Sequence, residues 1–112
     1  MWRKVMLSIF ASFGLSLSAS AFTECTKSVR NVWTATDGGV WVCFHEVGGC
    51  IKWSGTQFSE EVRNRFYSKA VTALAADRKL TIRYPEDTLD CAAQPTRGDF
   101  VGLWLQDLPA NG

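Results

Sequence analysis

Alternating apolar and polar residues, interrupted by glycine-rich turns, form the main pattern of the chain beyond residue 21. This two-residue period is typical of half-buried strands, and the β-branched and aromatic residues within it favour the same structure. The turns Asp37-Gly38-Gly39 and Gly48-Gly49 supply the glycines that tight reversals need. The pattern predicts five strands, at Ser28–Thr36, Val40–Val47, Cys50–Trp53, Leu80–Tyr84 and Phe100–Gln106.

The second predicted strand divides its side chains between two faces, because successive residues of a strand point in opposite directions. One face carries Val40, Val42 and Phe44. The other carries Trp41, Cys43 and His45, which are expected to border one patch of surface. In the last predicted strand, Gly102 indicates a bulge or a close backbone contact.

A single helix is predicted between the third and fourth strands. Ser59 is a suitable N-cap, and the two glutamates that follow it stand where the helix dipole favours acidic side chains. Apolar residues then recur every four positions, with Ala73 beside them, at Val62, Phe66, Ala70 and Leu74. The helix is expected to cover Glu60–Asp77 and to pack one of its faces.

The predicted order is three strands, a helix and two strands, which makes the protein mainly β with one helix. This is the layout of the OB-fold, a five-stranded Greek-key barrel whose face and loops bind oligosaccharides or oligonucleotides. A plain α+β sandwich fits the same order. The predicted function depends on the five strands closing into a barrel and on the helix plugging one end of it.

Residues 1–21 have the layout of a cleavable signal peptide. Arg3 and Lys4 precede an apolar run, and Ala19-Ser20-Ala21 supplies the small residues of a cleavage site. The apolar run is shorter than the roughly 20 residues that span a bilayer. We therefore expect export to the periplasm or the medium, with residues 22–112 as a single domain and no membrane span after cleavage.

Four cysteines, all beyond residue 21, predict two disulfides, because a small exported domain has a limited core and folds in an oxidising compartment. Cys43 and Cys50 lie near the ends of neighbouring strands, so a bridge between them is sterically possible. Cys25 and Cys91 would then form the second bridge. The other two pairings stay open, and a four-cysteine zinc site is the rival interpretation.

Charge and residue types argue against nucleic-acid binding and against catalysis. Loss of Arg3 and Lys4 leaves 10 basic and 11 acidic residues, a formal charge of −1, which does not attract phosphates. His45 is the only histidine, no serine elbow or metal-ligand spacing is present, and the cysteines are expected to be paired. We therefore predict a protein that is not an enzyme and that needs no metal or cofactor.

Four tryptophans in the expected domain are a high number for its size: Trp33, Trp41, Trp53 and Trp104. Indole rings stack on the apolar side of sugars, but they also fill cores. Trp104, between two leucines, is expected in the core, whereas Trp41 and Trp53 are candidate exposed platforms for a ligand.

The chain resembles the B subunits of AB5 toxins of the subtilase cytotoxin, pertussis toxin and typhoid toxin group. The resemblance covers most of the chain beyond the signal. It is carried by Arg65-Phe66-Tyr67-Ser68, Leu80-Thr81-Ile82-Arg83 and Val101-Gly102-Leu103, and by the paired cysteines in Val42-Cys43-Phe44 and Gly49-Cys50-Ile51. It implies a Cys43–Cys50 bridge, an OB-fold, a homopentamer, binding to glycans or glycoproteins, and a toxin A subunit as partner.

The resemblance also implies site residues. In that family a serine near the mature N-terminus contacts sialic acid, and here Thr26 and Ser28 stand in that stretch, without the family's tyrosine. Typhoid-toxin-like members have a basic residue two positions after the strand-two cysteine, where this chain has His45. Together with Trp41 and Trp53, these residues form the predicted glycan site. The alternative function is a periplasmic protein-interaction factor, an inhibitor or immunity protein of an envelope hydrolase.

Overall fold

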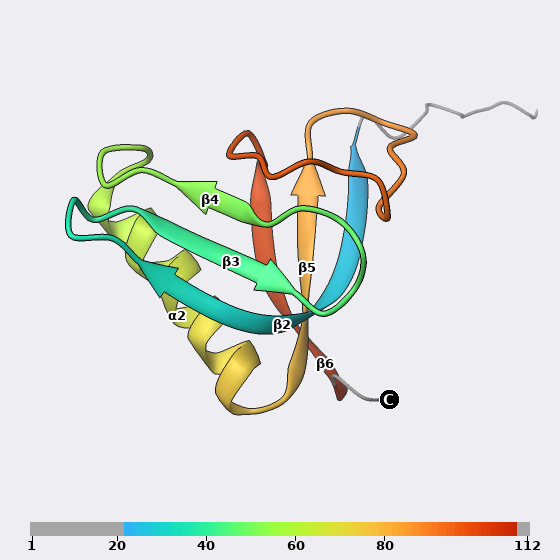
Figure 1. Ribbon diagram of the computed structural model, residues 1–112, viewed down its shortest axis with the longest axis horizontal. Coiled ribbons are helices and arrows are strands. Elements are labelled where there is room, and N and C mark those ends of the chain that lie inside the picture. The colour runs from blue at the N-terminus through green and yellow to red at the C-terminus, as the bar shows by residue number, and fades with distance from the viewer. Residues whose placement is uncertain (1–21, 110–112) are drawn as a thin grey trace, which may run out of the picture.

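The computed structural model describes residues 22–109 and contains the predicted order of three strands, one helix and two strands. Figure 1 shows the chain coloured from one end to the other. The elements are β2 (Thr23–Thr34), β3 (Val40–Phe44), β4 (Ile51–Trp53), α2 (Glu60–Ala75), β5 (Arg78–Tyr84) and β6 (Gly102–Pro109). Residues 22–109 are therefore mainly β with one helix, as predicted.

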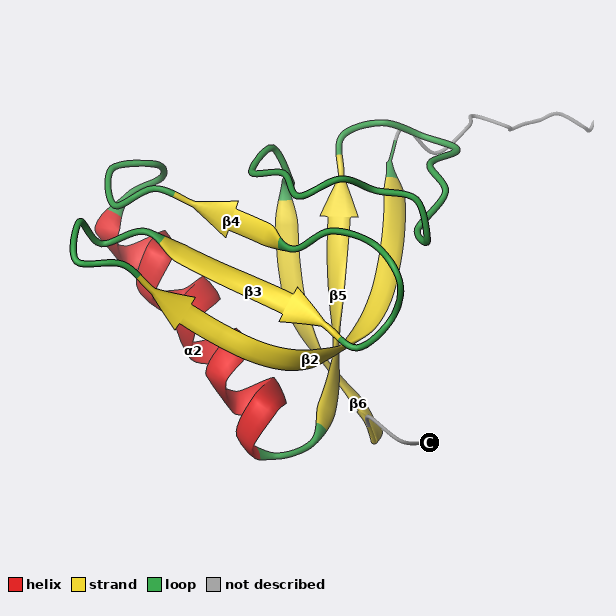
Figure 2. Cartoon of the chain, viewed as in Figure 1, coloured by secondary structure: helices red, strands yellow, loops and turns green. Residues whose placement is uncertain are grey.

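The strands form one antiparallel sheet in the order β4-β3-β2-β5-β6. The long strand β2 belongs to both halves of it: Thr23–Ser28 pairs with β5, and Val29–Thr34 pairs with β3. An irregularity in register lies between Val29 and Asn31, where the partner strand changes. The strand curves strongly there (Figure 2), so the two halves of the sheet face each other across the core.

The expectation of a closed barrel is wrong. No ladder joins β4 to β6, and the sheet is open between these two strands. An isolated parallel bridge between Ile51 and Arg97 links the backbone across the gap. There the Lys52 N–H donates to the Arg97 carbonyl at 3.0 Å, and the Arg97 N–H donates to the Cys50 carbonyl at 3.1 Å. Because β6 begins only at Gly102, the chain has left β4 before the last strand starts.

Aromatic side chains connect β4 to the start of β6 in place of backbone pairing. Trp53 of β4 lies 5.9 Å, centroid to centroid, from Phe100, and Phe100 lies 5.3 Å from Phe66 of the helix. Phe58, just before the helix, is in edge-on contact with both phenylalanines. Since Trp53 is only 2% exposed, this cluster is part of the core and holds the open side of the sheet together.

The helix begins where predicted and ends two residues early. The Ser59 side chain accepts a hydrogen bond from the Val62 N–H, and α2 ends at Ala75 because Asp77 takes a positive φ of 57°. Ala70 and Ala73 are buried against β2, β5 and β6. Leu74, expected on the packed face, is 42% exposed.

Replacing Ser59 with alanine should lower the free energy of unfolding by about 1 kcal/mol, because the Val62 N–H would lose its side-chain acceptor. Urea denaturation followed by circular dichroism measures this difference. Ser68→Ala is the matched control: Ser68 is exposed within the helix, where alanine is favoured, so its variant should be at least as stable as the parent. Equal stability of the Ser59 variant and the parent would contradict the cap.

Both expected disulfides are present, Cys43–Cys50 and Cys25–Cys91, and no described cysteine is free. None is therefore available as a thiolate zinc ligand, and the pairing fits an oxidising compartment. No helix between residues 22 and 109 has the length and apolar character needed to cross a bilayer. The predicted signal peptide lies outside the described residues.

Several boundaries differ from the prediction. β2 starts at Thr23, not at Ser28, because its first half pairs with β5. β3 ends at Phe44, three residues early, and residues 45–49 form a loop. Gly102 marks no bulge: it pairs with Arg83, and the register shift in this pair of strands lies between Arg78 and Leu80.

Candidate functional site

The outer face of β2, β3 and β4 carries two tryptophans and a lysine in a row. Val40, Val42 and Phe44 point into the core, as predicted, so the residues between them point outward. The antiparallel register places Trp33 opposite Trp41, and Trp41 opposite Lys52. We call Asn31, Trp33, Trp41, Cys43 and Lys52 the tryptophan face.

The two indoles meet edge to face. Their ring centroids are 6.4 Å apart and the planes are inclined by 86°. Trp33 is 55% exposed and Trp41 is 37% exposed, so each ring keeps surface that other side chains do not cover. Solvation of this much aromatic surface is unfavourable, and adjacent exposed aromatics commonly mark a place where a ligand or partner binds.

Lys52 adds an unpaired cation to this face. Its ammonium lies 5.3 Å from the centroid of the Trp41 ring, a cation–π distance. Within residues 22–109 its side chain has neither a hydrogen bond nor an ion pair with a carboxylate. The three N–H donors of the ammonium are thus available to a ligand that approaches Trp41.

Two hollows adjoin the indole pair. The first has a volume of about 420 Å³ and lies toward the 35–39 hairpin turn, with Asp37, Lys52, Ser54 and Gln57 around it. The second has a volume of about 490 Å³ and lies toward the Cys43–Cys50 disulfide, with Asn31 and Cys43 in its lining. Trp33 and Trp41 line both hollows.

The polar groups of the first hollow are held in place by the loops. One carboxylate oxygen of Asp37 accepts the Gly39 N–H at 2.9 Å, and the Gln57 side-chain amide donates to the Gly98 carbonyl at 2.7 Å. Gly38, with a φ of 89°, provides the left-handed residue of this turn. The second oxygen of Asp37 keeps acceptor capacity, so a fixed carboxylate and a free ammonium border the same hollow.

Of the five predicted ligand-binding residues, only Trp41 lies on this face in an exposed position. Trp53 is buried in the aromatic cluster, so the expectation of an exposed platform there is wrong. His45 is exposed but follows the end of β3 and lines neither hollow. Trp104, expected in the core, is half-buried on the sheet, with Arg83 5.3 Å from its ring centroid.

Thr26 and Ser28 lie on another part of the sheet. The Thr26 and Thr81 hydroxyls are 2.7 Å apart. Ser28 is 4% exposed, so its hydroxyl cannot reach a ligand without movement of the fold. Its N–H donates to Glu46 at 2.9 Å. Burial raises the pKa of the Glu46 carboxyl, but hydrogen bonds from Ser28 and from the Glu46 backbone, together with the charge of Lys79, outweigh burial, so the pKa is lowered overall.

A hollow of about 420 Å³ over Thr26 has a buried lysine beneath it. Lys27 is 4% exposed and donates to the Val47 carbonyl at 3.2 Å. Burial lowers the pKa of its ammonium, while the nearby carboxylates of Glu46 and Asp90 oppose that shift. Lys27 thus connects β2 with the 45–49 loop, in surroundings that are already negative, so this hollow is a poor site for an anion.

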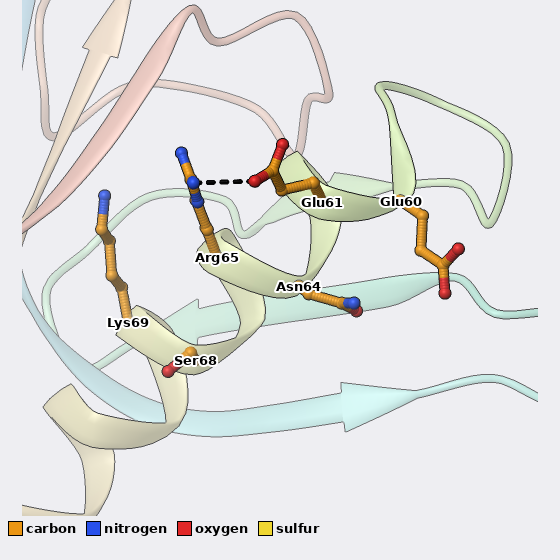
Figure 3. A pocket seen from close by; sticks show the side chains of 6 residues that line it. All are labelled: Glu60, Glu61, Asn64, Arg65, Ser68 and Lys69. Atoms are coloured by element: carbon orange, nitrogen blue, oxygen red, sulfur yellow. Dashed lines mark hydrogen bonds and ion pairs between the residues drawn. The ribbon is translucent and has the colours of Figure 1, made fainter.

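A larger hollow, of about 620 Å³, follows the outer side of α2 (Figure 3). Both of its cationic side chains are already engaged. Arg65 pairs with Glu61 at 2.8 Å, and Lys69 donates to the Leu103 carbonyl at 3.2 Å. Without an aromatic side chain in its lining, this hollow is a solvated helix face, less suited to a ligand than the tryptophan face.

No metal centre is formed by the described part of the chain: it has no group of three or more His, Cys, Asp or Glu side chains placed around one point. The strongest ionic cluster is at Arg97, which pairs with Glu86 and Asp99 and stacks 4.8 Å from the Tyr84 ring. Hydrogen bonding to Arg97 lowers the pKa of Asp99. These contacts secure the loop before β6.

Trp33 and Lys52 were not predicted as site residues. The spacing of Trp33 from the hairpin turn does indicate that it lies beside Trp41. Residues equally distant from the centre of a hairpin turn lie opposite each other. Trp33 and Trp41 are each four residues from Asp37, so a hairpin over this turn brings them together. Lys52 is opposite Trp41 only because of the β3–β4 register, which the sequence leaves open.

The chain matches no protein-family model and shows no significant similarity to a curated protein or to a solved structure.

Proposed function

We propose that this protein is an exported carbohydrate-binding module whose ligand lies on the tryptophan face. The observation that carries the proposal is the exposed, perpendicular pair Trp33–Trp41 beside the unpaired ammonium of Lys52. Indole faces stack on the C–H side of a pyranose ring, and the polar groups around it hydrogen-bond its hydroxyls. The protein acts by binding, without a catalytic step.

The polar lining favours a sugar over a purely apolar ligand. Asp37 and Lys52 are charged, and the amides of Asn31 and Gln57 contribute donors and acceptors to the hollows on either side of the indoles. An apolar ligand would leave the Lys52 ammonium and the Asn31 amide desolvated and unpaired, which is costly. A saccharide has hydroxyls for them and an apolar face for the tryptophans.

We also propose that the fold is an open variant of the OB-fold. The strand order and the position of the helix support this, and the Ile51–Arg97 bridge joins the third strand to the segment before the fifth. The resemblance to AB5 toxin B subunits implied a closed barrel. Because the sheet is open, the proposed function rests on the tryptophan face and not on that resemblance.

Export is part of the proposal. Two disulfides support an oxidising compartment, either the periplasm or the exterior of the cell. The predicted signal peptide supports the same compartment.

A glycan array tests the proposal. The full-length sequence is expressed and the protein is purified under oxidising conditions, together with Trp41→Ala and the control Tyr67→Ala, which removes an exposed aromatic from the helix. The parent and the control should retain the same glycans, and the Trp41 variant should lose at least about four-fifths of the signal, because a ring stacked on an aromatic side chain contributes about 1–3 kcal/mol.

Two results would contradict the proposal: no glycan retained by the parent, or equal retention by the Trp41 variant. A pull-down from envelope extract is run in parallel. Stoichiometric capture of a single hydrolase, lost in the Trp41 variant, would favour the alternative of a protein-interaction factor, because tryptophans also anchor protein interfaces.

A further inference from the structure

We propose that the ligand of the tryptophan face is a linear oligosaccharide of at least two linked rings, which the protein binds in one direction only. This inference rests on the proposed carbohydrate binding and adds the length and orientation of the ligand. It follows from the way in which the indole pair divides the face into two unlike hollows.

The two hollows lie on opposite sides of the indole pair along the strands. Along the segment that contains β3, the first hollow includes Gly39 and Trp41, whereas the second includes Trp41 and Cys43. On β2 the same shift occurs about Trp33. Both hollows have volumes in the roughly 300–1,000 Å³ range of small-ligand sites, so each is large enough for a sugar ring.

The distance along the face exceeds one ring. Gly39, which directly precedes β3, and Cys43 are four residue steps apart, about 13 Å at a rise of about 3.3 Å per residue. A single pyranose placed at either end would contact one hollow and leave the other to water. A saccharide that lies along β3 instead crosses the indole pair and has one pyranose ring on each side of it.

The two ends offer different chemistry. The hollow near the hairpin turn has the carboxylate of Asp37 and the unpaired ammonium of Lys52, two charged groups that bind hydroxyl groups strongly. The hollow near the disulfide has the neutral amide of Asn31 and the sulfur of Cys43. Within the described residues the Asn31 side chain makes no hydrogen bond, so its amide is available. A saccharide whose hydroxyls match the charged hollow at one end and the neutral hollow at the other therefore no longer matches either hollow when its direction is reversed.

Ligand length is tested by calorimetric titration of the parent protein with glucose, galactose and N-acetylglucosamine, each as monosaccharide, β1,4-linked disaccharide and tetrasaccharide. For the series that binds, the disaccharide should bind at least tenfold more tightly than its monosaccharide, and the tetrasaccharide no less tightly than the disaccharide. A monosaccharide that binds as tightly as its disaccharide would overturn the inference and leave carbohydrate binding intact. No binding in any series, with a blank array, would overturn the proposed function itself.

The contributions of the two hollows are measured separately with two variants. Lys52→Met changes the hollow near the turn, and Asn31→Ala changes the hollow near the disulfide. Each should weaken disaccharide binding by roughly threefold to tenfold, and the double variant should show the product of the two losses, because Lys52 and Asn31 line different hollows. Unchanged melting temperatures exclude loss of fold. If either variant leaves disaccharide affinity unchanged, the ligand does not span both hollows.

Discussion

Replacing Cys25 and Cys91 together with alanine should lower the free energy of unfolding by about 4 kcal/mol, because this bridge closes a loop of 66 residues. The loss of chain entropy on cross-linking grows with loop length, so the Cys43–Cys50 bridge, with a separation of only seven residues, should contribute about 2 kcal/mol. Urea denaturation of the parent and the two double variants, monitored by tryptophan fluorescence, measures both values.

The larger loss of stability expected without the Cys25–Cys91 bridge has a second cause, which the same two double variants test. Cys25 is 1% exposed and packs in the core, and its partner holds the loop before β6 against β2. We therefore expect the Cys25/Cys91 variant to lose cooperativity as well as stability. A ranking in which the short bridge contributes more than the long one would contradict this description of the loop.

Replacing Trp53 with alanine should cost about 3–5 kcal/mol and leave little folded protein at 37 °C, because the ring is 2% exposed and contacts both Phe66 and Phe100. The same change at Trp33, which is 55% exposed, should alter stability by no more than about 0.5 kcal/mol. Melting temperatures of the two variants make the comparison directly.

The contrast between the two variants tests the fold at its open side. Trp53 lies where β4 and β6 fail to pair, so its loss removes the packing that replaces a ladder. Phe100→Ala, in the same cluster, should be destabilising to a similar degree, since Phe100 is 3% exposed. A stable Trp53 variant would show that the sheet does not depend on the aromatic cluster.

Alternation of apolar and polar residues was sufficient to predict the five strands in order, because each strand buries one face, and apolar residues that recur every four positions predicted the helix. The pattern in Val40–Phe44 predicted its buried and exposed sides correctly. The helix start was predictable from Ser59, since capping is a local effect. The predicted strands made a Cys43–Cys50 bridge possible without excluding the other pairings, and the resemblance to toxin B subunits favoured it; both favoured bridges are present.

Closure of the sheet could not be predicted from the sequence, because it depends on contacts between distant segments. The bend of β2 near Asn31 shows no glycine or proline in the sequence, and it arises where the strand exchanges β5 for β3. The contact of Phe100 with Trp53 joins residues 47 positions apart. Only the packed structure shows that side chains, and not a ladder, link β4 to β6.

The candidate site was predicted in part. Trp41 was expected on an exposed face and is there, but Trp53 was assigned to the same role although Lys52 precedes it. In a strand, one of two neighbours must face the core, and the charged Lys52 is the residue that solvation keeps outside. The same reasoning for Ile51–Trp53 places Trp53 inside and Lys52 on the outer face, whereas the position of Lys52 opposite Trp41 depends on the β3–β4 register.

The most direct test is a two-dimensional ¹H–¹⁵N spectrum of the indole N–H groups during titration with the tightest-binding tetrasaccharide. We predict progressive shifts for the signals of Trp33 and Trp41, and unchanged signals for Trp53 in the core and Trp104 across the sheet. Shifts confined to Trp104, or no shift in any indole signal, would contradict binding at the tryptophan face.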